Sequence, residues 1–138
     1  MIAIAAVSDA PLSLSAHVDA VAGPRAGAIA TFLGTVRDHD PSVEGVVVGL
    51  DYSAHPSAAQ VIAEIAARHD APDLVIAVTH RIGSLAVGEA AIVAAVSAPH
   101  RREALDTVSA LVEAVKAELP VWKRELLADG THTWVGLS

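Results

Sequence analysis

The sequence has no cysteine and only two lysines among its 138 residues. Without cysteine, the chain has no disulfide framework, no thiolate nucleophile and no cysteine-based zinc or iron–sulfur site, and the cytoplasm is the expected compartment. No run of about 18 uninterrupted apolar residues is present, so we expect no transmembrane helix and no membrane partner. The first 12 residues also lack the basic region of a signal peptide.

Aromatic residues are scarce as well, at 3% of the sequence, although hydrophobic residues make up 53%. This apolar share predicts one ordered domain over residues 1–138, with part of its apolar surface buried between subunits. The net charge of −7 argues against nucleic acid as a partner, because a phosphate backbone requires a basic surface. An acidic protein whose cations lie in a few short segments is better suited to a small anion.

Several motifs that would indicate particular chemistries are missing. None of the seven histidines has HxxxH or HExxH spacing, so no metal site is expected. The serines lack a G-x-S-x-G context, and the glycines form neither a P-loop nor a dinucleotide fingerprint, so no cofactor is expected. The HRIG segment, residues 80–83, is predicted to be a strand end and a structural turn rather than a site.

Hydrophobic periodicity and turn residues predict an α+β protein with three helices. The predicted strands cover residues 2–7, 27–36, 43–52, 73–80, 90–97, 121–127 and 131–135. The first predicted helix begins at Ser13 or Ser15 and ends near Ala22, the second runs from Pro56 to His69, and the third covers residues 100–119. Residues 82–85 are predicted to form a turn. Pro120 ends the last helix, and Gly34 marks a break or bulge in its strand. Adjacent strand pairs alternate with helices, which favours a mixed or antiparallel sheet over a doubly wound parallel one.

The two lysines, Lys116 and Lys123, lie seven residues apart on either side of Pro120. An amine can act as a base or a nucleophile, whereas arginine keeps its proton. A chain reversal at Pro120 would bring the two amines together, and a pocket shared with Arg37 would favour a neutral amine. A purely structural role is the alternative for Lys116, because a cation in the last turn of a helix is stabilised by the helix dipole.

A second cluster of cations, His100, Arg101 and Arg102, lies at the start of the long predicted helix. Unpaired backbone N–H groups in a first helical turn already favour an anion. Arginine at this end is electrostatically unfavourable unless an anion is bound. A bound anion and a solvated surface cluster are equally open explanations.

Five segments together resemble the large, catalytic subunit of molybdopterin synthase. They are GAIATFLGTVRDH, LDYSAHPSAA, HRIGSLAVGE, SAPHRREAL, and K-x-x-x-P-V-W-K-R-E followed by W-V, and they span about residues 27–135 in the family's order and spacing. The most specific part is K-x6-K with P-x-W-K-R-E. One position departs from the family: the chain has Tyr52-Ser53 where relatives often have Tyr-Glu.

The resemblance implies an α/β-hammerhead-like fold with a small extra β subdomain, in a cytoplasmic homodimer. Each protomer of such a protein binds a small ubiquitin-like sulfur-carrier subunit, which makes a heterotetramer. The carrier's C-terminal Gly-Gly thiocarboxylate enters the active site, and sulfur passes to cyclic pyranopterin monophosphate in two rounds. The product is the dithiolene of molybdopterin, in the biosynthesis of the molybdenum cofactor.

The resemblance also maps the family's substrate pocket onto this chain. The matching positions are Thr35, Val36, Arg37, His100, Arg101, Lys116, Lys123, Arg124 and Glu125. Arg37, Arg101 and His100 would hold the substrate phosphate, for which a planar guanidinium is well suited. Lys116 would act at the thiocarboxylate, by acid–base or covalent catalysis, while Lys123 would polarise a substrate oxygen or stabilise negative charge.

Two other functions remain as alternatives. One is a non-catalytic anion-binding or scaffold dimer with the same fold, for which the Ser53 departure is a hint. The other is a different small-molecule enzyme that uses an amine. A small acidic protein that ends in Gly-Gly should bind to the sulfur-transfer enzyme and to the scaffold dimer, but not to a different amine-using enzyme. Binding without sulfur transfer would indicate the scaffold dimer.

Overall fold

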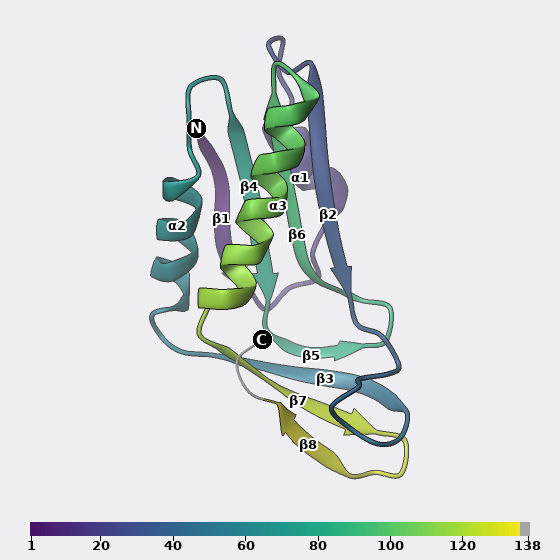
Figure 1. Ribbon diagram of the computed structural model, residues 1–138. Helices are drawn as coiled ribbons and strands as arrows, with labels where there is room; N and C mark the ends of the chain where they lie inside the picture. Colours follow the sequence, from purple (N-terminus) through teal and green to yellow (C-terminus); the bar gives the residue numbers. More distant parts are fainter. Residues whose placement is uncertain (136–138) are drawn as a thin grey trace.

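The computed structural model describes residues 1–135 (Figure 1). Residues 136–138, which the single-domain prediction includes, lie outside the described residues. The strands are β1 (Ile2–Ser8), β2 (Ala28–Thr35), β3 (Val47–Ala54), β4 (Val75–Arg81), β5 (Gly83–Ala86), β6 (Ala90–Ala98), β7 (Val121–Leu127) and β8 (His132–Val135), and the helices are α1 (Leu14–Val21), α2 (Ala58–Arg68) and α3 (Arg101–Glu118). The α+β class and the three helices are therefore confirmed.

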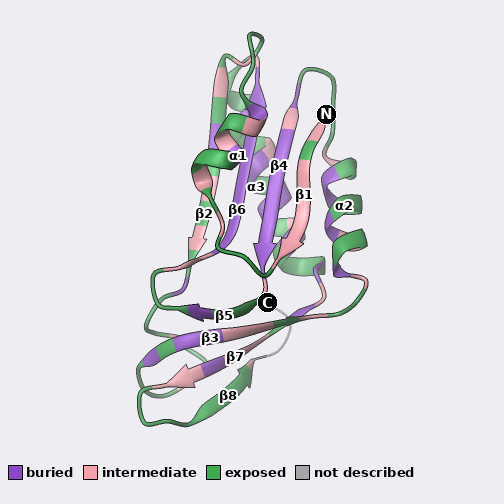
Figure 2. Cartoon of the chain, turned by 180° about the vertical axis from the view of Figure 1, so that it is seen from behind, coloured by how far each residue is buried: buried purple, intermediate pink, exposed green. Residues whose placement is uncertain are grey.

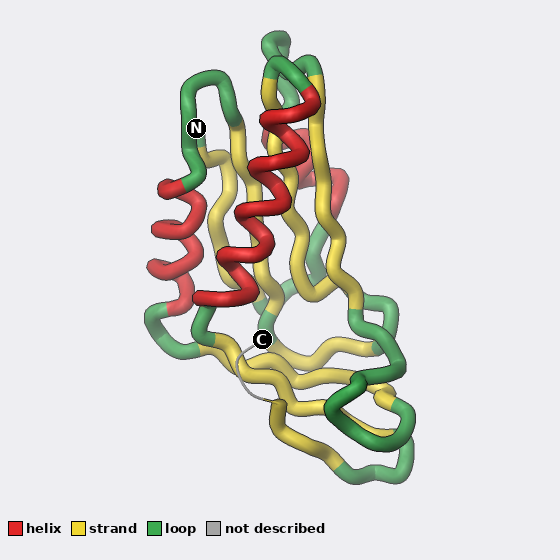
Figure 3. Tube along the Cα trace, in the orientation of Figure 1, coloured by secondary structure: helices red, strands yellow, loops and turns green. Residues whose placement is uncertain are grey.

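The strands form two sheets of four. In the first sheet, with order β1-β4-β6-β2, β1 and β4 are parallel and the other neighbours antiparallel; the second sheet, β5-β3-β7-β8, is entirely antiparallel. The second sheet lies across one end of the first, as the small β subdomain of the predicted fold (Figure 3). A site at this junction can receive side chains from both sheets.

Two layers of helix cover the first sheet. Helices α2 and α3 pack on one face and α1 on the other (Figures 1 and 2). Strands β4 and β6 are buried along almost their whole length, which explains their nearly continuous apolar sequences. Helix α3 buries one stripe, which consists of Ala104, Val108, Leu111, Val112 and Val115. Because this stripe faces the sheet, the side chains on the opposite face of α3 point toward solvent.

The helix ends follow local sequence signals. Ser13 caps α1, since its Oγ accepts a hydrogen bond from the Ala16 N–H at 3.1 Å. Helix α3 ends just before Leu119 and Pro120, and β7 begins at once with Val121. The chain therefore passes from the first layer into the second sheet at this proline. No helix in residues 1–135 combines the length and apolar character needed to cross a bilayer.

Two element predictions were wrong in detail. Strand β3 begins at Val47 rather than Val43, because residues 40–45 form a turn: the Val43 N–H donates to the Asp40 carbonyl, and Gly45 has a φ of +101°. The predicted turn at 82–85 overlaps β5, a short strand that pairs with β3. Its only buried side chain is Leu85, so its sequence carries no readable periodicity.

Candidate active site

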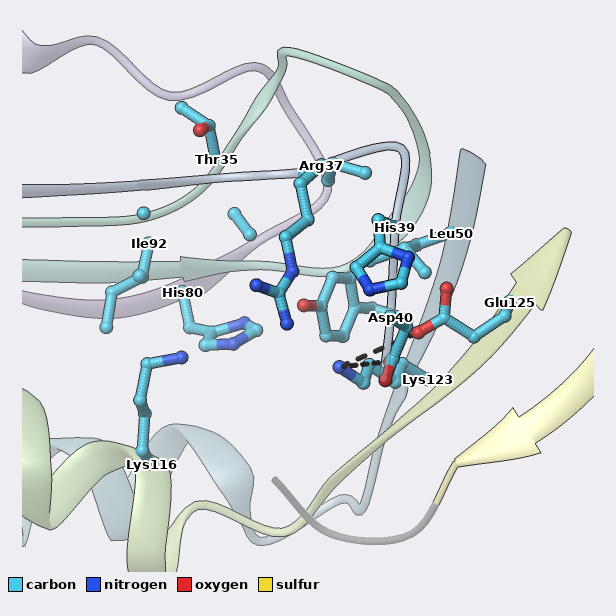
Figure 4. Close-up of a pocket in the computed structure, with 14 residues that line it drawn as sticks. Thr35, Arg37, His39, Asp40, Leu50, His80, Ile92, Lys116, Lys123 and Glu125 are labelled. Atoms are coloured by element: carbon cyan, nitrogen blue, oxygen red, sulfur yellow. Dashed lines mark ion pairs between the residues drawn. The ribbon is translucent and has the colours of Figure 1, made fainter. Parts of the chain in front are cut away.

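A pocket of about 210 Å³ opens at the junction of the two sheets (Figure 4). It is lined by Gly34, Thr35, Val36, Arg37, His39, Asp40, Leu50, Tyr52, His80, Ala91, Ile92, Lys116, Lys123 and Glu125. Both lysines therefore reach one space, although one belongs to α3 and the other to β7. Six of the nine residues predicted for the site line this pocket.

Lys123 lies at the acidic end of the pocket. Its ammonium group is 3.6 Å from Asp40 Oδ2 and 3.7 Å from Glu125 Oε1. Strand alternation explains the second contact, because residues two apart in β7 point to the same face of the sheet. The Lys123 side chain is only 22% exposed, and Glu125 is almost fully buried. These ion pairs hold the amine in one place.

The two carboxyl groups beside Lys123 have pKa values shifted in opposite directions. Burial and a hydrogen bond with Asp40 raise the pKa of Glu125 to about 7, although Lys123 opposes the shift. The pKa of Asp40 is lowered by the same hydrogen bond from Glu125, and then by hydrogen bonds from Ser42. The Ser42 N–H and Oγ donate to Asp40 Oδ1 at 2.9 and 2.7 Å. At neutral pH, Asp40 is the ionised partner and Glu125 is close to half protonated.

Lys116 occupies the opposite end of the pocket, in the last turn of α3. Its side chain is exposed, and within residues 1–135 no carboxylate forms an ion pair with it. Its ammonium group extends toward the ring of His80 (Figure 4). Burial, with a smaller effect of Lys116, lowers the pKa of this histidine, so the ring is neutral at neutral pH.

The end of β2 and the residues just after it, which include Arg37, form one wall of the pocket. The pairing of β2 with β6 shifts between Gly34 and Thr35, which is the irregularity that Gly34 predicted. A Cβ at Gly34 would lie 2.6 Å from Ile92 Cγ2, so a side chain here would collide with the neighbouring strand. After this shift, Arg37 extends into the pocket beside His80 (Figure 4).

Two predicted phosphate ligands, His100 and Arg101, lie elsewhere in the same chain. They are at the N-terminal end of α3, whereas Lys116 is in its last turn. An 18-residue helix is about 27 Å long, so these groups cannot reach the pocket of their own chain. They line a separate surface hollow together with Arg102.

Arg124 and Ser53 point away from the pocket. Arg124 forms an ion pair with Asp51, and its guanidinium carbon is 5.6 Å from the ring centroid of Trp134. Ser53 is exposed and pairs with Trp122, on the face opposite Tyr52. The departure at Ser53 therefore leaves the lining of the pocket unchanged, and Arg124 supports β7 from behind.

Asp40, Tyr52 and His80 line the pocket but were absent from the predicted site. Asp40 belongs to a loop that a turn-rich sequence explains fully, so it carried no signal of its own. His80 did carry one, because it lies near the end of a strand whose first four residues are all apolar. A polar side chain that is buried is the informative exception among core residues, so its place at the end of a buried strand was the available signal.

A comparison with protein families decides the relationship. The model of the family described as "MoaE protein" matches residues 7–118, which is most of the chain. This chain belongs to the MoaE family. The resemblance found in the sequence segments is thereby confirmed.

Individual MoaE-family relatives agree with this assignment. Molybdopterin synthase catalytic subunit 1 of Mycobacterium tuberculosis is 40% identical over 133 residues, covering 94% of this chain and 88% of the relative. The molybdopterin synthase catalytic subunit of Bacillus subtilis is 38% identical, covering 94% and 83%. The crystal structure of molybdopterin synthase from Staphylococcus aureus matches with a TM-score of 0.86 at 28% identity, covering 94% and 95%, which confirms the predicted fold.

Proposed function

We propose that this chain is the catalytic subunit of a molybdopterin synthase and works in the cytoplasm. It transfers sulfur from the thiocarboxylated C-terminus of a small ubiquitin-like carrier to cyclic pyranopterin monophosphate. The observation that carries this proposal is the meeting of Lys116, Lys123 and Arg37 in one pocket of a MoaE-family fold. Relatives about 40% identical bear the name of this enzyme.

The charge of the pocket suits two anionic reactants. Three cations, Arg37, Lys116 and Lys123, face one ionised carboxylate, Asp40, and one carboxyl group that titrates near pH 7. The balance is positive at neutral pH. A thiocarboxylate and a cyclic phosphate are both attracted to such a pocket in an otherwise acidic protein.

The two lysines take different parts in the proposed reaction. Lys116 lies at the end without carboxylates, where it meets the carrier's terminal thiocarboxylate and acts as an acid–base group or through a covalent bond. Lys123 is fixed by Asp40 and Glu125 and polarises a substrate oxygen. Arg37 holds the substrate phosphate with its planar guanidinium group.

A second copy of the chain supplies the remaining phosphate ligands. His100 and Arg101 are exposed and too far along α3 to serve their own pocket. In the proposed homodimer, the start of α3 from one protomer reaches the pocket of the other. The dimer with two carriers is then the heterotetramer expected from the family resemblance.

The test is to mix the protein with thiocarboxylated carrier and cyclic pyranopterin monophosphate and to follow the products by mass spectrometry. The proposal predicts the dithiolene product and loss of sulfur from the carrier. A stable complex with the carrier but no sulfur transfer would contradict it and favour the scaffold alternative. No observation favours that alternative, since Ser53 lies outside the pocket.

A further inference from the structure

His80 occupies a place in the pocket that the roles above leave unexplained. It lies near the end of β4 and is only 7% exposed, yet it lines the pocket together with Lys116 and Tyr52. The structure shows a protein partner for only one of its two ring nitrogens, Nδ1, within residues 1–135. The other nitrogen, Nε2, is not among the fully buried side-chain atoms that lack a partner there, so it is open to the pocket and can accept a hydrogen bond from a group in it.

The one visible partner identifies the tautomer of His80. Its Nδ1 is 2.7 Å from the backbone carbonyl oxygen of Arg81. A carbonyl oxygen can only accept a hydrogen bond, so Nδ1 carries the proton and donates it. In the neutral ring, Nε2 therefore carries the lone pair and is an acceptor.

The ring is also held in a fixed orientation. The Tyr52 ring packs against it edge to face, with centroids 5.1 Å apart and planes at 80°. Together with the bond to Arg81, this contact prevents the imidazole from turning. A fixed acceptor in a pocket can orient a donor that reaches it.

Lys116 and Arg37 are the two donors that extend toward this ring, and of the two Arg37 is assigned above to the substrate phosphate (Figure 4). The other charged or titratable groups around the ring are Tyr52 on β3 and Arg37 after β2. The same pocket also holds His39 and Asp40 from the loop before β3, and Lys123 and Glu125 from β7. Lys123 is already engaged by two carboxyl groups. Lys116 has no such partner among the described residues.

We propose that His80 is the positioning residue for Lys116: its neutral Nε2 accepts a hydrogen bond from the ammonium group. A neutral acceptor orients the amine without cancelling its charge, which a carboxylate would do. The full charge of Lys116 then remains available to the incoming anion. The effect on turnover rests on the proposed function, whereas the contact itself does not.

Protonation of His80 reverses this arrangement. An imidazolium ring has no acceptor and places a second positive charge beside Lys116. Because burial lowers the pKa of His80 below its ordinary value of 6.5, the contact is intact at neutral pH and is lost only in acid. Protonation of His80 as pH falls should therefore change the surroundings of the Lys116 ammonium group.

A pair of substitutions separates the two nitrogens of His80. In His80→Asn, an amide N–H can replace Nδ1 at the Arg81 carbonyl, but no atom reaches the position of Nε2. In His80→Gln, the longer amide places an oxygen near that position and can accept from Lys116. His69→Asn is the matched control, since the His69 Nδ1 also lies 2.8 Å from a backbone carbonyl oxygen, that of Ile65, outside this pocket.

In the sulfur-transfer assay, we expect His80→Asn to lower kcat about 10- to 100-fold with little change in KM. His80→Gln should recover part of that loss, and His69→Asn should change kcat by less than about twofold. Equal losses in the two His80 variants, or none in either, would overturn the proposal. Circular dichroism of each variant checks that the fold is kept.

A second measurement needs neither carrier nor substrate. Protein labelled with ¹³C and ¹⁵N at lysine gives NMR signals from only two lysines, which can be followed from pH 8 to pH 5. We expect the Lys116 signal to shift with the midpoint of the His80 ring, below pH 6.5, in the wild type and in neither His80 variant. A Lys116 signal with no step at that midpoint would overturn the proposal. A correct step in a protein that transfers no sulfur would instead contradict the proposed function.

Discussion

The two ends of the pocket hold the same type of residue in different surroundings. At one end, Lys123 is half-buried between Asp40 and Glu125, at 3.6 and 3.7 Å. At the other end, Lys116 is exposed and faces the neutral ring of His80. Lys123 is therefore part of the packed structure as well as of the site, whereas Lys116 belongs to the site alone. The surroundings, rather than the residue type, assign the two roles.

The largest expected effect comes from replacing the lysine that is free of carboxylates. Lys116→Ala should lower the rate of sulfur transfer by about 10²- to 10⁴-fold, because it removes the amine that we propose meets the thiocarboxylate. Lys116→Arg should fail similarly, since it keeps the charge but loses a titratable amine. The measurement is the single-turnover rate, with carrier binding and circular dichroism as controls. A normal rate in Lys116→Ala would show that the amine is wrongly assigned.

Lys123→Ala tests whether the second lysine has a structural role that the first lacks. Removing it leaves Asp40 and Glu125 without their counter-charge, so we expect a loss of about 1–3 kcal/mol in the free energy of unfolding. Activity should fall about 100-fold as well. Lys116→Ala should change stability by less than about 0.5 kcal/mol. Urea denaturation of the two variants side by side decides the point, and equal stability losses would remove the contrast.

Glu125→Gln tests the raised pKa of Glu125 at the Lys123 end of the pocket. The pKa of Glu125 is raised from 4.5 to about 7, so its protonated form favours folding; this contribution is full below about pH 4.5 and is lost as pH rises through 7. Glutamine cannot ionise. Between pH 5 and pH 8, the wild type should therefore lose about 1–3 kcal/mol more stability than Glu125→Gln.

Urea denaturation at the two pH values measures this difference. Glu113→Gln, at an exposed position of α3, is the matched control and should follow the wild type. If Glu125→Gln also follows the wild type, the pKa of Glu125 is not raised in the folded protein.

The smallest effect is expected outside the pocket. Ser53→Glu introduces the residue that the family resemblance leads us to expect, on the face of β3 opposite the pocket. Sulfur transfer should change by less than about twofold, because surface substitutions away from a site are nearly neutral. A rate increase of tenfold or more would mean that this face of β3 takes part in the reaction. The Lys116 and Lys123 ends of the pocket would then not be the only parts of the site.

Features set by local pattern could be predicted from the sequence. The stripe on α3 and the apolar runs of β4 and β6 indicated those elements because burial imposes a period on the residues. Pro120 indicated the reversal that brings Lys116 and Lys123 into one pocket. Strand β5 was missed because four residues with one buried side chain carry no period.

Features that depend on distant segments were harder to predict. Asp40 meets Lys123 only because the loop between β2 and β3 comes close to β7. His80 lies near Lys116 only because β4 and α3 contribute to the same pocket. Neither pairing leaves a trace in sequence spacing. The separation of His100 from Lys116 is different, because the length of the predicted helix already implied it.

The most direct test of the contrast is to locate the carrier's C-terminus in the complex. A carbodiimide joins a carboxylate to a nearby amine without a spacer, and with only two lysines in the chain, peptide mass spectrometry assigns the joined position without ambiguity. We expect the carrier's terminal carboxylate to be joined to Lys116. Joining at Lys123 with none at Lys116 would contradict it.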